Sequence, residues 1–186
     1  MVHLGTVELE TPRLILRRFT EDDALMMFAN WAHDPEVTRH LTWPAHTSVQ
    51  DSQAVLADWV PRYSQPDFYQ WAVVPKNLGQ PIGSIGAVRV HNDTEQLEAG
   101  YCIGRQWWHK GLMSEAFSAA LRFWFDRVGI NRVEAAHDVE NPRSGAVMER
   151  CGMTREGILR QALRRSDGRL VDIVLYSVLA EDHRPR

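Results

Sequence analysis

The chain is poor in cysteine and has no long apolar run. Its two cysteines, Cys102 and Cys151, form no CxxC pair, which argues against a disulfide framework or a cysteine-rich zinc site and suits a reducing compartment. No segment approaches the ~20 consecutive apolar residues of a membrane span, and the first residues lack the pattern of a signal peptide. We therefore expect a cytoplasmic protein without a membrane partner.

Charge of one sign is also scarce. The formal net charge is −3 over 186 residues, so no overall basic field favours nucleic acid as a partner. The eight histidines fall in no HExxH motif and in no pair at helical spacing with a carboxylate, and the sequence therefore predicts no metal site. A nucleotide site is not favoured either, because neither a GxGxxG nor a Walker pattern occurs.

What is present is a regular alternation of strand-like and helix-like periods in a chain that is 44% hydrophobic and 24% charged. This length and composition suffice for one good core, and we expect a single domain over residues 1–186. Helical spacing predicts helices that follow Thr20 and Gly111, and two more over residues 49–60 and 141–152. Period-two segments and turn signals predict strands over residues 13–19, 68–74, 82–90, 97–103 and 132–139, and two final strands around an Asp-Gly turn at 167–168.

The most informative stretch is the junction between the strand that ends at Ile103 and the helix that follows Gly111. A helix start offers unpaired N–H groups and a partial positive charge, and here it comes directly after Arg105, His109 and Lys110. Such a junction is a ready site for an anion, with phosphate as the expected guest. The alternative is an ordinary connection in which Gly111 relieves a turn and Lys110 is solvated, and the spacing alone leaves both open.

Several ordered segments resemble the RimJ/RimL branch of the GNAT N-acetyltransferase superfamily. Residues 108–116, Trp-His-Lys-Gly-Leu-Met-Ser-Glu-Ala, resemble its pyrophosphate loop for acetyl-coenzyme A, and residues 11–17 resemble its opening strand. Residues 140–144, 149–153 and 156–160 resemble its second cofactor segment, in the same order. The resemblance implies a mixed α+β fold, with a single twisted, mostly antiparallel sheet of about seven strands, splayed central strands and about four flanking helices.

The resemblance also implies acetyl-coenzyme A as co-substrate. Its pantetheine arm would enter the gap between the splayed strands, and a backbone N–H near Ile103 would face the thioester oxygen. A donor aimed at such an oxygen is commonly worth ~3 kcal/mol of barrier. The residues that this assignment places on the cofactor are Tyr101, Cys102, Ile103, Trp108, His109, Lys110, Gly111, Leu112, Met113, Ser114, Asn141, Arg143 and Ser144.

The implied reaction is direct attack of a primary amine on the thioester in a ternary complex. The acceptor is either a protein N-terminal α-amine or a small-molecule amine, and a homodimer is compatible with both. At pH 7, deprotonating an α-amine of pKa near 8 costs only ~1.4 kcal/mol, against about 4 to 5 kcal/mol for a lysine-like amine. In the resembling branch, the segment that holds Trp31 and Trp43 covers the acceptor site, so these side chains either form its wall or pack helices on the sheet. The alternative from another functional class is a module that holds acyl-coenzyme A without turnover.

Two residues are candidates for proton transfer. Glu98 is the candidate general base, because it precedes the thioester position by a few residues and burial would raise its pKa; the alternative is a solvent-facing Glu98 paired with an arginine. Many relatives use a tyrosine as general acid, but Met148 occupies the matching position here. Ser144 is therefore the candidate that contacts the sulfur or donates a proton, unless Asn141 and Ser144 are simply the N-cap and first turn of a helix.

Overall fold

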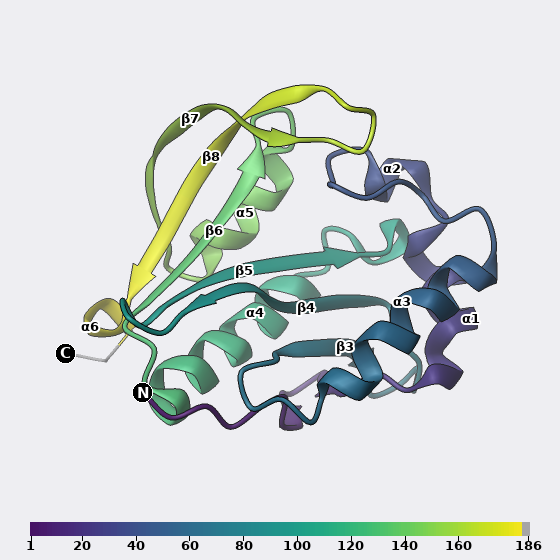
Figure 1. Cartoon of the computed structure of the whole chain (residues 1–186), viewed down its shortest axis with the longest axis horizontal. Coiled ribbons are helices and arrows are strands. Elements are labelled where there is room, and N and C mark those ends of the chain that lie inside the picture. Colours follow the sequence, from purple (N-terminus) through teal and green to yellow (C-terminus); the bar gives the residue numbers. More distant parts are fainter. Residues whose placement is uncertain (184–186) are drawn as a thin grey trace.

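The computed structural model describes residues 1–183 and shows one twisted sheet with helices packed on it (Figure 1). The strand order is β1-β2-β3-β4-β5-β6-β8-β7, and within these residues β5 and β6 form the one parallel pair. The strands are β1 (Leu9–Glu10), β2 (Leu14–Arg17), β3 (Gln70–Pro75), β4 (Gly83–His91), β5 (Gln96–Ile103), β6 (Arg132–Asp138), β7 (Thr154–Arg164) and β8 (Leu170–Leu179). The mixed α+β fold is confirmed. The sheet exceeds the expected seven strands because the two-residue β1 adds an edge beside β2.

Six α-helices lie within the described residues, two more than expected. They are α1 (Ala24–Met27), α2 (Pro35–Thr38), α3 (Val49–Arg62), α4 (Leu112–Phe123), α5 (Pro142–Arg150) and α6 (Ala180–His183). The short α2 and α6 account for the difference, while π-helical turns at Phe28–Ala32 and Trp124–Val128 extend α1 and α4. None of these helices is long and apolar enough to cross a membrane. The expected domain ends at residue 186, and its residues 184–186 lie outside the described part.

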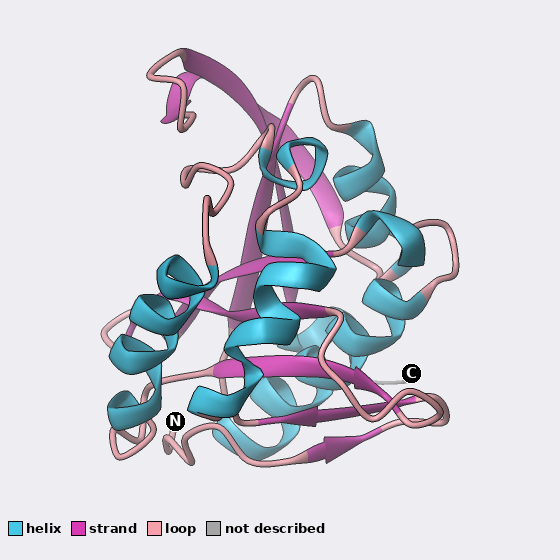
Figure 2. Cartoon of the chain, turned by 90° about the vertical axis from the view of Figure 1, so that its right-hand side faces the viewer, coloured by secondary structure: helices cyan, strands magenta, loops and turns pink. Residues whose placement is uncertain are grey.

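Strand β3 is buried on both faces of the sheet. Trp71 and Val73 point to the core that α4 covers, whereas Ala72 and Val74 point to a second core under α1 and α3. Because neighbouring side chains of a strand point to opposite faces, a strand buried on both sides is apolar at almost every position. Figure 2 shows the strong twist of this sheet, with one group of strands nearly upright and another nearly horizontal.

The central feature is the divergence of β5 and β6. They pair through three residues each, Gln96–Glu98 with Arg132–Glu134. Beyond that point β5 continues along β4 to Ile103, and β6 continues along β8 to Asp138, so the two strands form a V (Figure 1). The expected splayed strands are therefore confirmed. Residues 99–103 of β5 face the opening of the V without a strand partner on that side.

The closed end of the V is held by an ion network across β6, β8 and β7. Arg132 of β6 donates to both carboxylate oxygens of Glu156 in β7, at 2.6 and 2.8 Å. Ser177 of β8 lies between them, and its Oγ donates to Glu156 Oε1 at 2.5 Å. These bonds hold the pKa of Glu156 at about 2, below its ordinary value of 4.5. The network fixes β6 to the hairpin of β7 and β8 where it leaves β5.

This network predicts a pH-dependent stability. Because the pKa of Glu156 is lowered in the folded state, its ion pair stabilises the protein above the ordinary pKa of 4.5 and is lost as the pH falls toward 2. We expect Glu156→Gln to lower the free energy of unfolding by about 0.5 to 1 kcal/mol at pH 7 and by less at pH 3. Urea denaturation at both pH values measures this, with Glu8→Gln, which removes an exposed carboxylate, as the control. Equal losses for Glu156→Gln at both pH values would contradict the assignment.

Candidate active site

A cavity of about 560 Å³ lies at the open end of the V. Its lining comes from α2, the end of β5, the loop before α4, and the first turns of α4 and α5. It brings together all the residues predicted on the cofactor except Lys110, namely Tyr101, Cys102, Ile103, Trp108, His109, Gly111, Leu112, Met113, Ser114, Asn141, Arg143 and Ser144. The volume is within the range of small-molecule and cofactor sites.

The loop before α4 presents unpaired backbone N–H groups to this region. Gly111 is its N-cap with φ +71°, and His109 also has a left-handed backbone with φ +60°. Within residues 1–183, no N–H from His109 to Ser114 donates to a backbone carbonyl, and α4 has no side-chain cap. A row of free N–H groups at the N-terminus of a helix is a site for an anion.

Arg13 and Glu115 hold the loop from outside. Arg13 Nη1 donates to the Lys110 carbonyl at 2.9 Å, and its Nε donates to Glu115 Oε2 at 2.6 Å. Thr11 Oγ1 donates to the other carboxylate oxygen of Glu115 at 2.6 Å. Burial alone would raise the pKa of Glu115, but these hydrogen bonds hold it below its ordinary value. Sequence reasoning missed this clamp, because its members lie about 100 positions apart and only the resemblance of residues 11–17 to an opening strand pointed to the region.

Two polar side chains fit a bound ligand better than an empty loop. The Oγ of Ser114 is buried and has no hydrogen-bond partner within the described residues. Asn141 is the N-cap of α5, yet its side chain makes no capping bond there. Because buried polar groups are normally hydrogen-bonded, an unsatisfied hydroxyl beside free N–H groups is what an anionic ligand would complete. The anion site stays a prediction, and these groups are compatible with it.

Tyr101 contributes a side chain as well as a backbone segment. Its hydroxyl donates to the Ser144 carbonyl at 2.8 Å and accepts from Ser144 Oγ at 2.9 Å, while its ring packs on Phe117 of α4 with 5.3 Å between ring centres. Burial raises the pKa of the Tyr101 phenol, so it stays protonated at physiological pH. Ser144 is therefore held toward β5 by more than first-turn helix chemistry. The sequence contained no signal for this bond, which spans the opening of the V.

The contacts of Trp108 and Cys102 show which groups near the end of β5 are already engaged. The indole N–H of Trp108 donates to the Ile103 carbonyl at 2.9 Å, so this carbonyl is already engaged. The Trp108 ring lies 5.2 Å from the Arg143 guanidinium, a cation–π contact that positions the arginine at the cavity. Cys102 Sγ lies 3.4 Å from Ser84 Oγ, and burial raises the pKa of its thiol. The side chain of Cys102 therefore has a packing role.

Glu98 lies apart from the other candidates. It belongs to the closed part of the V, opposite Glu134, and does not line the cavity. Its carboxylate forms an ion pair with Arg89 at 3.5 Å, and 29% of the side chain is exposed. This geometry matches the alternative in which Glu98 pairs with an arginine, and its role as base stays a prediction. Trp31 is 1% exposed and packs in the core under α1 and α3, so it does not form a wall of the cavity.

The open end of the V is tied together by polar contacts. Asp34 caps α2 by accepting from the Glu36 N–H at 2.9 Å, and it pairs with Arg105, just after β5, at 3.0 Å. On the other side, the Ser166 N–H at the tip of the β7–β8 hairpin donates to the Leu41 carbonyl at 3.1 Å. The segment around α2 therefore covers the cavity and touches both arms of the V.

The loop geometry yields a test with a matched control. Gly111 and Gly79 both have φ near +70°, so Gly111→Ala and Gly79→Ala should each lower the free energy of unfolding by about 1 kcal/mol. We expect only Gly111→Ala to change coenzyme A binding, with a Kd raised about tenfold, because the N–H groups would turn away from the ligand. Urea denaturation and titration calorimetry measure the two effects. Wild-type affinity in Gly111→Ala, or an equal loss in Gly79→Ala, would contradict the loop's assignment.

Comparisons with known proteins agree with this geometry. The N-acetyltransferase p20 of Bacillus licheniformis, described as uncharacterized, is 28% identical over 94% of this chain and 97% of its own. The [ribosomal protein uS5]-alanine N-acetyltransferase of Escherichia coli (strain K12) is 28% identical over 96% of this chain and 94% of its own. The crystal structure of the microcin C7 self immunity acetyltransferase MccE in complex with acetyl-CoA and AMP shares the fold, with a TM-score of 0.83, 20% identity and coverage of 91% and 93%.

These relatives are named N-acetyltransferases, which confirms the expected class of enzyme. Acetyl-coenzyme A as co-substrate agrees with the family, and the MccE structure itself contains acetyl-CoA. The family profile described as "Acetyltransferase (GNAT) domain" matches residues 13–154, from the residue before β2 to the first residue of β7. Since this match covers well over half of the sequence, the chain belongs to the GNAT acetyltransferase family.

Proposed function

We propose that the protein transfers the acetyl group of acetyl-coenzyme A to the α-amine of a protein N-terminus, with alanine as the first residue to test. The observation that carries the transfer is the cavity in the V, with free N–H groups of the loop at one side and the unpaired edge of β5 at the other. The acceptor is suggested by the E. coli relative, whose name specifies an alanine of ribosomal protein uS5. A small-molecule amine is the other candidate acceptor.

The chain's own groups can hold each part of the co-substrate. The N–H groups at the start of α4 and the Ser114 hydroxyl suit the diphosphate. Arg143, held over Trp108, and the exposed Lys110 are the cations near the same loop for the 3′-phosphate. The free edge of β5 from Tyr101 offers backbone groups to the pantetheine amides, as an added strand would use them.

The chemistry needs little beyond positioning. A backbone N–H near Ile103 would stabilise the oxyanion that forms when the amine attacks the thioester, for which ~3 kcal/mol is a common value. The Ser144 hydroxyl, which donates to Tyr101 in this structure, would turn to the sulfur as it leaves, supply it with a proton and regain one from solvent. Tyr101 positions Ser144 through their pair of hydrogen bonds. Many relatives use a tyrosine as general acid at the position of Met148, and in this chain Tyr101 would assist the proposed acid instead.

An α-amine is the acceptor that fits this site best in energy. At pH 7 its deprotonation costs ~1.4 kcal/mol, about 3 kcal/mol less than for a lysine side chain. We place the reaction in the cytoplasm, because Cys102 and Cys151 are both free thiols. We also assign it to one catalytic domain. A homodimer stays a prediction.

The acceptor is tested by following thiol release from acetyl-coenzyme A with a panel of amines. We expect a peptide that begins with alanine to give a kcat/KM at least tenfold above that of its N-acetylated form with an internal lysine. Free amines such as spermidine form the small-molecule arm of the panel. A preference for that arm would overturn the protein acceptor, and no turnover with any amine would overturn the transfer itself. Mass spectrometry of the product peptide locates the acetyl group.

The role of Ser144 is tested by Ser144→Ala and Tyr101→Phe. Ser144→Ala should lower kcat by about 10²-fold, because the leaving thiolate loses its proton donor. Tyr101→Phe should lower kcat by about tenfold, because the serine loses its orienting partner while the reacting hydroxyl remains. Neither should change the Kd of coenzyme A by more than about threefold. Wild-type kcat in Ser144→Ala would leave the serine as a residue of the helix start and remove it from the mechanism.

A further inference from the structure

A buried ion network lies at the open end of the V, apart from the groups assigned above. Asp138, the last residue of β6, has a fully buried side chain whose Oδ2 accepts a hydrogen bond from Arg165 Nε. Arg165 Nη2 donates to Glu140 Oε2 at 2.6 Å, and the Glu140 N–H donates to Asp138 Oδ1 at 2.9 Å. Burial alone would raise the pKa of Asp138, but these bonds and the guanidinium charge hold it below its ordinary value. Asp138 is therefore an ionised carboxylate at neutral pH.

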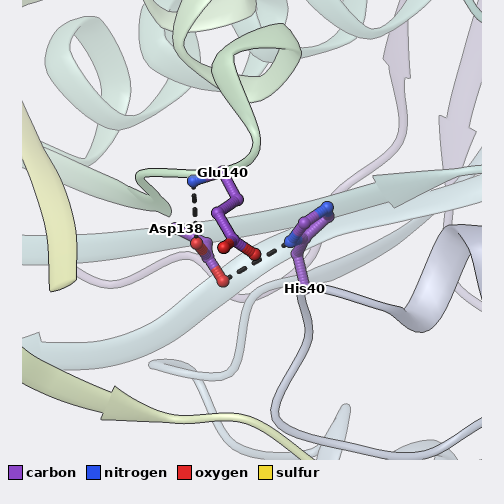
Figure 3. Close-up of side chains that lie close together, drawn as sticks. All are labelled: His40, Asp138 and Glu140. Atoms are coloured by element: carbon purple, nitrogen blue, oxygen red, sulfur yellow. Dashed lines mark hydrogen bonds and ion pairs between the residues drawn. The ribbon is translucent and has the colours of Figure 1, made fainter. Parts of the chain in front are cut away.

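His40 contacts this network and also lines the cavity. It follows α2, and its Nδ1 lies 3.4 Å from Asp138 Oδ2, while its second ring nitrogen points away from both carboxylates (Figure 3). An ionised carboxylate only accepts, so Nδ1 carries the hydrogen and Nε2 keeps a lone pair in the neutral ring. His40 lines the 560 Å³ cavity, and 16% of its side chain is exposed.

The same cluster has the composition of a metal site, but its charges are already matched. One ligand atom each from His40, Asp138 and Glu140 lies within 4.8 Å of the others. The Arg165 guanidinium already bonds both carboxylates, and a metal ion would place a second positive centre against it. Asp138 therefore orients His40, and Arg165 neutralises the charge of the Asp138 carboxylate.

The other titratable groups of the cavity suit proton abstraction less well. Burial raises the pKa values of Tyr101 and Cys102, which keeps both protonated, and Arg165 lowers the pKa of Glu140. An imidazole is in general a stronger base than a carboxylate, so it takes a proton from an ammonium group more readily than a glutamate does. The remaining charged or titratable groups that share the cavity with His40 are Glu36, Arg39, His109, Arg143 and Arg150.

We propose that His40 is the general base of the acetyl transfer and that Asp138 and Arg165 position it. The inference rests on the proposed function. Nε2 of His40 accepts one proton from the acceptor ammonium and passes it to solvent, and the amine nitrogen then bonds to the carbonyl carbon of the thioester. The C–S bond breaks with its electron pair on sulfur. A second proton leaves the nitrogen, which gives the neutral amide, and a proton ends on the sulfur of coenzyme A.

The test is His40→Asn, because the asparagine amide can keep a hydrogen bond to Asp138 in place of Nδ1 while it removes the basic Nε2. We expect kcat at pH 7, with acetyl-coenzyme A and a peptide that begins with alanine, to fall about 10²-fold with little change in KM. The loss should shrink toward pH 10, where the amine is deprotonated without help. His91→Asn, at an exposed histidine at the end of β4, should keep the wild-type pH profile. A thermal shift with coenzyme A checks that each variant is folded.

Three results would overturn the assignment. Wild-type kcat in His40→Asn would exclude a proton transfer through Nε2. An equal loss at pH 7 and pH 10 would make His40 a structural link between α2 and β6. A pH-dependent loss in Glu98→Gln, with His40→Asn unaffected, would return the role of base to Glu98. If the wild-type enzyme turns over no amine, the proposed function fails and this inference with it, whereas turnover with an unaffected His40→Asn removes this inference alone.

Discussion

The parallel pairing of β5 with β6 ends after three residues, and the rest of the molecule depends on that limit. Each strand keeps its other neighbour, since β5 stays paired with β4 up to Ile103 and β6 with β8 up to Asp138. The backbone groups of β5 that face the opening thus remain unpaired in the middle of a sheet, where buried polar groups normally find partners. A ligand with amide groups of its own would satisfy them, as we propose for the pantetheine arm of the co-substrate.

The two ends of the V are held by different means. The closed end has strand pairing on both sides and the bidentate Arg132–Glu156 pair across β8. The open end has no strand pairing between β5 and β6. The Tyr101 hydroxyl bonds Ser144 of α5 across it, and the Asp34–Arg105 ion pair joins α2 to the end of β5. Side-chain contacts open at lower free energy than a strand ladder of the same width. The opening is therefore the place where a large co-substrate can enter without unfolding the sheet.

Much of this arrangement could be predicted from the sequence, because it depends on local periods. The alternation before Ile103 and the helical spacing after Gly111 located β5, the loop and α4. The residues that the ordered resemblances assign to the cofactor line the cavity, except Lys110. The partners of individual side chains could not be predicted in this way. Arg13 with Glu115 and Tyr101 with Ser144 join residues that are 102 and 43 positions apart, and such contacts follow from tertiary packing and leave no trace in local spacing.

The sequence predicted on which face of β5 Glu98 lies, but not where Glu98 lies relative to the opening of the V. Alternation correctly separates it from Leu97 and Ala99, whose side chains are buried in the core under α4. What alternation does not state is where along the strand the V begins to open, and Glu98 lies one residue before that point. The register with β6 is set by Arg132 and the strands beyond it, far along the chain. A carboxylate on the correct face is thus kept at the closed end, beside Arg89.

The two proton transfers proposed for the reaction use groups that different strands hold. Ser144 belongs to α5 and bonds to β5 through Tyr101, and we assign it to the leaving thiolate. His40 follows α2 and bonds to the end of β6 through Asp138, and we assign it to the acceptor ammonium. Amine attack and thiolate departure each need a separate proton transfer. Because Tyr101 of β5 holds the proposed acid and Asp138 of β6 holds the proposed base, the divergence of β5 and β6 that leaves backbone groups unpaired would also separate the two transfers.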